Sequence, residues 1–231
     1  MVSNKNKNDG RKRPYRLKAR AERQEEVHRR ITKATVDLHR TVGPARTTVS
    51  EIAKLAGVQR ATVYNHFPTD LELIDACSSH WVADNPPPDP ATWAEIEDPG
   101  RRLEAALTAM YGYYDRGKDM LENVLRDAPL VPALEEINRR KWWPLIEGLV
   151  DLLSRGWVET ADRVAHPEAR PPEGPAGPPA SGAPGDQAGA IPLRASLHVA
   201  LDFFTWQTLA RSGLSNEEAA RLATKWVRAG A

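Results

Sequence analysis

The segment from Thr47 to Phe67, TTVSEIAKLAGVQRATVYNHF, constrains the fold more than any other part of the chain. Apolar residues within 49–55 recur at helical spacing behind Thr48, whose hydroxyl can cap the free N–H groups of a first helical turn. Gly57 follows where a helix commonly ends in a left-handed residue, so the chain is predicted to bend there. A second helix is predicted over 59–66. Together these parts predict a helix-turn-helix.

The second predicted helix buries one residue and exposes a mainly polar face. Val63 is spaced to turn inward, and the small Ala53 on the first helix allows the two helices to approach closely. The outward positions contain no acid: Gln59, Arg60, Ala61, Thr62, Tyr64, Asn65 and His66. Such groups suit base edges and phosphates, whereas a face built only for solvation usually mixes Glu with Lys. We therefore predict a DNA-binding surface, with a plain three-helix core as the alternative.

The same segment, followed by Pro68, Thr69, Asp70 and the helical LELI, closely resembles the N-terminal domain of TetR-type bacterial transcriptional regulators. The resemblance implies an all-α homodimer. Its N-terminal three-helix helix-turn-helix domain would bind DNA, and its C-terminal helical domain would bind a small ligand and dimerise. One difference is Asp70. Such sequences often carry Lys at this position, so one phosphate contact that the resemblance implies lacks its usual cation.

The resemblance also assigns roles to individual residues. It implies that the second helix enters the major groove, with Tyr64 and His66 near phosphates. We expect Arg60 and Gln59 to read base edges, and Thr48 to join Tyr64 and His66 in positioning phosphates. Ala61, Thr62 and Asn65 complete the predicted DNA-binding set.

Positive charge is concentrated in the N-terminal part of the chain, where the DNA-binding domain is predicted. Residues 1–80 carry 16 Lys and Arg against 9 Asp and Glu, a net charge of +7, whereas the remainder carries −6. Residues 1–22 are polar and basic, and we expect a disordered arm that follows phosphates or enters the minor groove. The alternative is a solubilising tail. The first helix is predicted from the spacing of Val27, Ile31, Ala34, Leu38 and Val42, before Gly43 and Pro44.

A fourth helix completes the predicted DNA-binding domain, residues 23–84. Leu71, Ile74, Cys77 and Trp81 line it, and the three prolines at 86–88 end it. We expect this helix to connect the two domains, so that its displacement by a ligand moves the recognition helix. The alternative is a rigid spacer.

The remaining residues, 85–231, are predicted to form the helical ligand-binding and dimerisation domain. Pro144 predicts a kink or restart within an apolar helical run. Between 167 and 189 the chain holds 7 Pro, 5 Gly and 5 Ala, which predicts a mobile loop at about 160–190. Two apolar helices follow, over 191–209 and 216–227. Their excess apolar surface predicts pairing with a second copy, through Phe203, Phe204, Trp206, Leu209, Leu222 and Trp226.

All seven tryptophans lie after residue 80, so the aromatic material for a ligand cavity is in the C-terminal part. The predicted pocket residues are Met110, Tyr114, Trp142, Trp143, Phe203, Trp206 and Gln207. The pair His198 and Asp202, one helical turn apart, would add polar anchors or lie in the dimer seam. The alternative for each aromatic residue is a place in the core.

Catalysis finds little support in the sequence. The six histidines have no metal-ligand spacing, the single Cys77 excludes an internal disulfide, and no phosphate-binding glycine loop or serine elbow is present. We therefore expect no enzyme activity, no metal site and no cofactor. Without a signal peptide or membrane-length apolar run, a cytoplasmic protein without membrane association is expected.

The predicted function is a ligand-responsive repressor that binds a palindromic DNA operator as a homodimer and is released by a small-molecule effector. Two alternatives remain open. One is a ligand-independent DNA-binding repressor or architectural protein. The other is a helical small-molecule-binding protein or enzyme that has lost DNA binding, which Asp70 favours.

Overall fold

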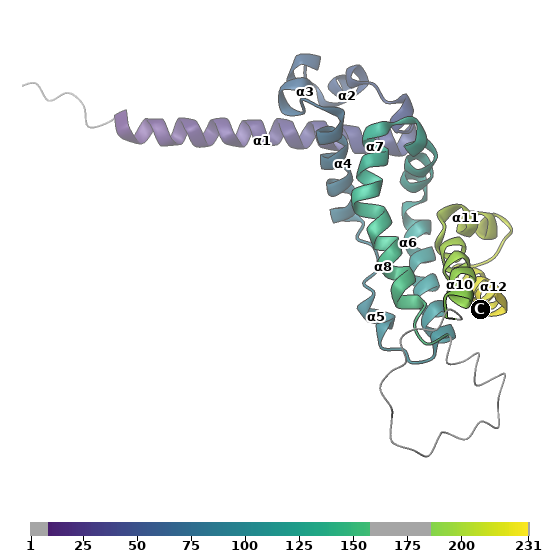
Figure 1. Ribbon diagram of the computed structural model, residues 1–231. Coiled ribbons are helices and arrows are strands. Elements are labelled where there is room, and N and C mark those ends of the chain that lie inside the picture. Colours follow the sequence, from purple (N-terminus) through teal and green to yellow (C-terminus); the bar gives the residue numbers. More distant parts are fainter. Residues whose placement is uncertain (1–8, 158–185, 231) are drawn as a thin grey trace, which may run out of the picture. The chain divides into compact units, whose positions relative to one another are not determined.

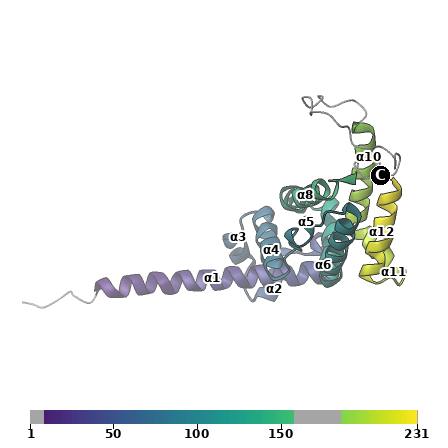
Figure 2. The ribbon, with the colours of Figure 1, turned by 90° about the horizontal axis from the view of Figure 1, so that it is seen from below.

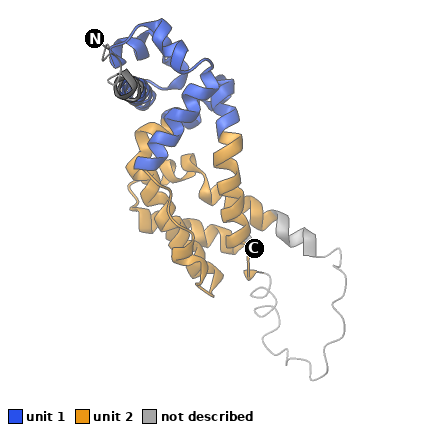
Figure 3. Cartoon of the chain, turned by 90° about the vertical axis from the view of Figure 1, so that its left-hand side faces the viewer, with its two compact units in different colours: residues 1–84, 123–137 blue, residues 85–122, 138–231 orange. Residues whose placement is uncertain are grey.

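The computed structural model describes residues 9–157 and 186–230, and these residues form helices and turns with no β-strand (Figure 1). The all-α prediction is therefore confirmed. The chain divides into two compact units, residues 1–84 with 123–137 and residues 85–122 with 138–231 (Figure 3). The mobile loop predicted at about 160–190 lies outside the described residues up to 185, and helix α10 begins at Asp186.

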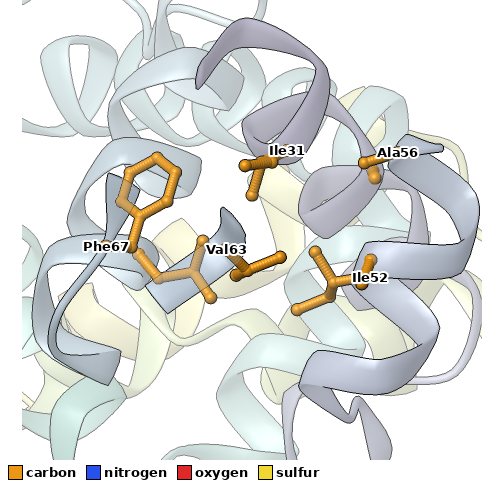
Figure 4. Close-up of a cluster of buried hydrophobic side chains, with 8 residues drawn as sticks. Ile31, Ile52, Ala56, Val63 and Phe67 are labelled. Carbon is orange, nitrogen blue, oxygen red and sulfur yellow. The ribbon is translucent and has the colours of Figure 1, made fainter. Parts of the chain in front are cut away.

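The first unit contains the predicted helix-turn-helix. Its elements are α1 (Asp9–Thr41), η1 (Pro44–Arg46), α2 (Val49–Ala56), α3 (Arg60–His66), α4 (Asp70–Asp84), the last residues of α6 (Pro99–Asp127), η2 (Ala128–Leu130) and α7 (Pro132–Ile137). Its core joins the first three helices, because Ile31, Ile52, Ala56, Val63 and Phe67 converge there (Figure 4). Val63 is the one buried residue of α3, as its spacing predicts.

Helix α1 begins earlier than the sequence predicts. Residues 9–22, expected to be part of a disordered arm, are helical, and residues 1–8 lie outside the described part. Ala, Arg, Lys and Glu make up nine of these 14 residues, and all are good helix formers. Lys18 and Glu22 add an exposed i,i+4 ion pair at 3.9 Å.

Helix α4 is fixed in the first unit by a second apolar cluster. Ile74 packs with Leu134 and Ile137 of α7, and Leu71 lies at the edge of the same cluster. The helix ends at Asp84, before the three prolines, as predicted. Helix α4, the predicted connector, is therefore packed against α7, which follows it far along the sequence.

The second unit consists of α5 (Ala91–Ala94), the greater part of α6, η3 (Asn138–Trp142), α8 (Trp143–Leu153), α10 (Asp186–Leu201), α11 (Phe203–Arg211) and α12 (Asn216–Gly230). The helix restarts near Pro144 as predicted: a π-helical turn ends at Trp142, and α8 begins with the proline in its first turn. No helix in the described part of the chain is both long and apolar enough to span a membrane.

Candidate nucleic-acid interface

Helix α2 begins at a reciprocal cap that fixes the side chain of Thr48. Its hydroxyl accepts a hydrogen bond from the Glu51 N–H (3.3 Å) and donates to the Glu51 carboxylate (2.7 Å), which also accepts from the Thr48 N–H (2.9 Å). The side-chain and backbone hydrogen bonds from Thr48 hold the pKa of Glu51 below its usual value. Thr48 therefore has a structural role in addition to its predicted contact with a phosphate.

The bend between α2 and α3 depends on Gly57. Its φ of 64° and ψ of 41° lie in the left-handed region, which side chains with a Cβ rarely adopt. The Val58 N–H then donates to the Ala53 carbonyl (2.9 Å), closing the end of α2. Because this turn is short and hydrogen-bonded, it sets the direction in which α3 leaves.

Helix α3 presents the predicted polar face to solvent. The side chains of Gln59, Arg60, Ala61, Tyr64 and Asn65 are exposed, and those of Thr62 and His66 are half-buried. Gln59 is the N-cap residue but makes no side-chain capping hydrogen bond, so its amide remains available to a ligand. Val63, only 1% exposed, holds the opposite side of the helix in the core.

The C-terminal end of α3 packs against α1. The His28 ring lies 4.4 Å from the Phe67 ring and 6.1 Å from the His66 ring, measured between centroids. His28 was not among the residues singled out from the sequence. Its place on α1 means that α1 passes directly beside the last turn of the recognition helix.

Asp70 has a local structural explanation. It is the first residue of α4, where the free N–H groups of the helix favour an acidic side chain. Thr69 and Glu72 complete the start of α4 with two reciprocal hydrogen bonds of 3.2 and 3.3 Å. The Asp70 carboxylate thus stabilises the start of α4. A Lys at the same position would instead favour contact with a DNA phosphate.

Two residues near the end of α6, Asn123 and Asp127, hold the bend between α1 and α2 through hydrogen bonds and are called the clamp below. These contacts were not predicted from the sequence. The Asn123 amide donates to the carbonyls of His39 (3.2 Å) and Arg40 (2.8 Å) at the C-terminal end of α1. The buried Asp127 carboxylate accepts from the Ala45 N–H (3.0 Å) in η1. The available signal was the i,i+4 spacing of these two polar residues just before Pro129, which places both on one helix face.

Gly43 is confined by the same clamp. Its φ of 93° is positive, and a Cβ built on it would lie 2.5 Å from both an Arg126 nitrogen and an Asp127 oxygen. Arg126 in turn donates to the Asp127 carboxylate at 2.8 Å. Burial, the largest effect, opposes ionisation of Asp127, but hydrogen bonds from Arg126 and Ala45 with nearby arginine charge lower its pKa.

Behind the clamp lies a buried pair, His39 and Cys77, which joins α1 to α4. The Cys77 Sγ lies 3.5 Å from the His39 Nδ1. Burial lowers the pKa of His39 to about 4, against an opposing effect from Asp127, and raises the pKa of Cys77 to about 12. Both groups are therefore neutral at pH 7.

The sequence profile of the bacterial regulatory proteins of the tetR family matches residues 31–77, which run from the core of α1 to the middle of α4. The chain carries a TetR-family helix-turn-helix domain. The predicted resemblance is thereby confirmed for the segment that contains the end of α1, the bend and the recognition helix.

Solved structures share the fold of this chain over most of its length. A transcriptional regulator from Rhodococcus sp. Rha1 is 21% identical, aligned over 88% of this chain and 96% of that chain, with a TM-score of 0.51. NalD, the secondary repressor of the MexAB-OprM multidrug efflux pump in Pseudomonas aeruginosa, is 16% identical over 89% and 96%, also with a TM-score of 0.51. Identities this low establish similarity of fold alone. A comparison with curated proteins finds no match.

The second unit contains an aromatic cluster at the place where the ligand pocket was predicted. Tyr114 of α6 lies 5.6 Å from Phe203, 5.8 Å from Trp206 and 6.5 Å from Trp142, between ring centroids. Met110, one turn earlier on α6, is buried. Gln207, the next residue along from Trp206, is half-buried.

Trp143 does not join the cluster, contrary to the prediction, because its side chain is 52% exposed. Successive residues of a helix point about 100° apart, so the turn that directs Trp142 inward directs Trp143 outward. Two polar groups of the cluster are hydrogen-bonded within the unit. The Tyr114 hydroxyl donates to the Leu201 carbonyl (2.6 Å), and the Trp206 Nε1–H donates to the Asn216 side chain (2.9 Å).

The predicted pair of His198 and Asp202 is not formed, since the helix expected over 191–209 breaks between α10 and α11. Asp202 caps α11 by accepting from the Thr205 N–H (2.8 Å). His198 faces Glu147 of α8 at 3.3 Å. In the part of the chain that the structure describes, no group of His, Cys, Asp and Glu side chains is arranged to hold a metal ion.

The apolar surface expected at a dimer seam is smaller than predicted. Phe203, Trp206 and Leu209 are buried within the subunit, because α11 turns them toward its own core. Leu222 is half-buried. Among the side chains that the structure describes on α10, α11 and α12, the large apolar ones that remain exposed are Val199, Phe204 and Trp226.

Proposed function

We propose that this chain is a homodimeric transcriptional repressor that binds a palindromic operator and releases it when a small molecule binds the second unit. One observation carries the proposal. The TetR-type bend presents an acid-free polar face of α3, and buried Val63 anchors that face to the core. A rigid helix with such a face is the element that enters a major groove.

The exposed side chains of α3 divide by chemistry. Arg60 and Gln59 lie at its N-terminal end, which is the end that reads bases in helix-turn-helix proteins, and both can make bidentate contacts to base edges. Thr48, Tyr64 and His66 carry groups suited to phosphate oxygens. Ala61, Thr62 and Asn65 would lie along the groove between these contacts.

Dimerisation rests on exposed apolar side chains. Val199, Phe204 and Trp226 come from three successive helices, α10, α11 and α12. Pairing with a second copy would remove them from water, and a two-fold axis would place two recognition helices about 34 Å apart, one turn of the duplex. A chain that sediments as a monomer at micromolar concentration would contradict this part of the proposal.

The effector would enter the aromatic cluster around Tyr114. Helix α6 supplies Tyr114 to that cluster, and its last turns supply Asn123 and Asp127 to the clamp on α1 and η1. A ligand that displaced α6 would therefore act on the bend that directs α3, in addition to any movement of the connector α4. NalD, which has a similar fold, is a repressor.

Binding to the DNA upstream of its own gene tests the proposal. Labelled duplex is titrated with protein at several salt concentrations, with a scrambled duplex of equal composition as the control. We expect preference for the upstream sequence and steep weakening as salt rises. Absence of binding at low salt would favour a ligand-binding protein or enzyme that has lost DNA binding.

A metabolite screen on the preformed complex then tests the effector. Release of the operator by a compound that also quenches tryptophan fluorescence supports ligand control, because the cluster contains Trp142 and Trp206. A substitution such as Trp206→Leu should weaken that response while leaving operator affinity unchanged. Operator binding that no compound alters would favour the ligand-independent repressor.

A further inference from the structure

We propose that the N-terminal part of α1, residues 9–26, is a second DNA-contacting element, which lies as a helix along the phosphates that flank the base pairs met by α3. This segment is called the α1 extension below. The inference rests on the proposed function, because it requires that α3 engage a duplex. It adds a contact outside the helix-turn-helix, made by a helix where the sequence predicts a disordered arm.

The α1 extension continues past the core of its own unit. The first core residue of α1 is Ile31, and Val27 packs at the edge of the core. From residue 18 to residue 26 every side chain is exposed except the half-buried Ala19. Figures 1 and 2, two perpendicular views, both show α1 running on beyond α2, α3 and α4.

The α1 extension leaves the unit beside the recognition helix. His28, just after its last residue, contacts Phe67 and lies 6.1 Å from the His66 ring, at the end of α3. A duplex that receives α3 in its major groove is therefore close to the C-terminal end of the α1 extension. At 1.5 Å per residue, these 18 residues extend about 27 Å, or about eight base pairs of B-DNA.

The charge of the α1 extension matches a polyanion. Residues 10–21 contain six Lys and Arg and no acid. Among the described side chains, Lys18, Arg20 and Arg23 are exposed, and Lys18 has only the weak pair with Glu22, in which both groups are more than half exposed. The sequence of the α1 extension has few apolar residues, Tyr15 and Leu17 the largest, which are too few to anchor it on a lipid surface.

The helical form itself favours an anionic partner. Most helical stability in proteins comes from tertiary packing, and the side chains from residue 18 to residue 26 are nearly all exposed, so they contribute little of it. The sequence also spaces Lys12, Arg16 and Arg20 four residues apart, and like charges at this spacing destabilise a helix. Phosphates that neutralise this charge would stabilise the helix, so duplex DNA is the occupant that the α1 extension fits.

The experiment compares two operator duplexes selected from random DNA by the full-length chain. The short duplex ends at the outermost base pair that selection fixes, and the long one adds ten pairs on each side. A triple variant, Arg16→Gln with Lys18→Gln and Arg20→Gln, removes three charges from the α1 extension. The matched control, Arg101→Gln with Lys118→Gln and Lys225→Gln, removes three exposed charges from the second unit.

We expect the wild type and the control to bind the long duplex at least tenfold more tightly than the short one. The triple variant should bind both duplexes alike. Its plot of log affinity against log salt should be shallower on the long duplex by about 0.9 for each phosphate that the variant no longer neutralises, or about 5 for six phosphates in a dimer. Ala19→Pro, which breaks the helix but keeps every charge, should also lose the gain from the longer duplex.

Three results would overturn the inference. If the wild type binds both duplexes equally, the flanks are not contacted, although the proposed function stands. If Ala19→Pro keeps the gain that the triple variant loses, a flexible arm makes the contacts. If the triple variant loses binding to anionic lipid vesicles but binds both duplexes as tightly as the wild type does, the partner is a membrane surface. Failure of the wild type to select any duplex would instead refute the proposed function.

Discussion

Asp127→Asn is the substitution with the sharpest consequence for stability. Its buried carboxylate accepts hydrogen bonds from the Ala45 N–H and the Arg126 Nε–H, at 3.0 and 2.8 Å. The amide of Asn offers one acceptor oxygen, so it can serve only one of these donors and turns its NH₂ group toward the other. Each hydrogen bond to a charged group contributes about 1.5–3 kcal/mol. We expect the variant to be less stable by about 2 kcal/mol.

Urea denaturation followed by circular dichroism measures this difference. With a slope of about 2 kcal/mol per M, the midpoint should fall by about 1 M. Asp37→Asn is the matched control, because Asp37 forms two surface ion pairs along α1, with Lys33 and Arg40, and such pairs contribute under about 0.5 kcal/mol each. Equal, small losses in the two variants would refute the view that Asp127 clamps η1.

The pH dependence gives a second test of the same carboxylate. Its pKa in the folded protein is below the ordinary value of 3.8, so the folded state favours the ionised form. The stabilisation is complete above pH 3.8 and is lost as the pH falls through the folded pKa. The difference between wild type and Asp127→Asn should therefore be largest at neutral pH and shrink below pH 3.8. A difference that persists unchanged at about pH 2 would contradict this reasoning.

Four other predictions use different measurements. Arg60→Ala should weaken operator binding by about 1–3 kcal/mol and relax preference at one base pair, and equal weakening on every sequence would exclude base reading. Because His39 has a pKa of about 4 when buried, wild-type stability should fall by about 2 kcal/mol between pH 7 and 5, and His39→Gln should lose this dependence. The Cys77 thiol, with its pKa raised to about 12, should react with a disulfide reagent only after unfolding. Gly43→Ala should destabilise more than Gly57→Ala, about 3 against about 1 kcal/mol in thermal or urea unfolding, because only Gly43 has atoms within 3 Å of a new Cβ; equal losses would contradict this.

The helix-turn-helix was predictable because its determinants are local. A capping threonine, a left-handed glycine and an inward valine act within one or two helical turns, so Thr48, Gly57 and Val63 specify this motif almost independently of the rest of the chain. The start of α4 at Asp70 and its end before the prolines follow from equally short-range chemistry.

Contacts between distant segments decided what the sequence pattern left open. Helical periodicity places Trp142 and Trp143 in one apolar run, but only the packing of η3 against α6 determines which ring turns inward. In the sequence, Asp202 is spaced to pair with His198 on one helix. In the structure the helix is interrupted at Asp202, whose side chain caps α11 instead. Asp127 reaches Ala45 across 82 positions of sequence. Caps and turns are local interactions that residue order alone reveals, whereas burial and long-range hydrogen bonds depend on which surfaces meet, and that is decided by the folded chain.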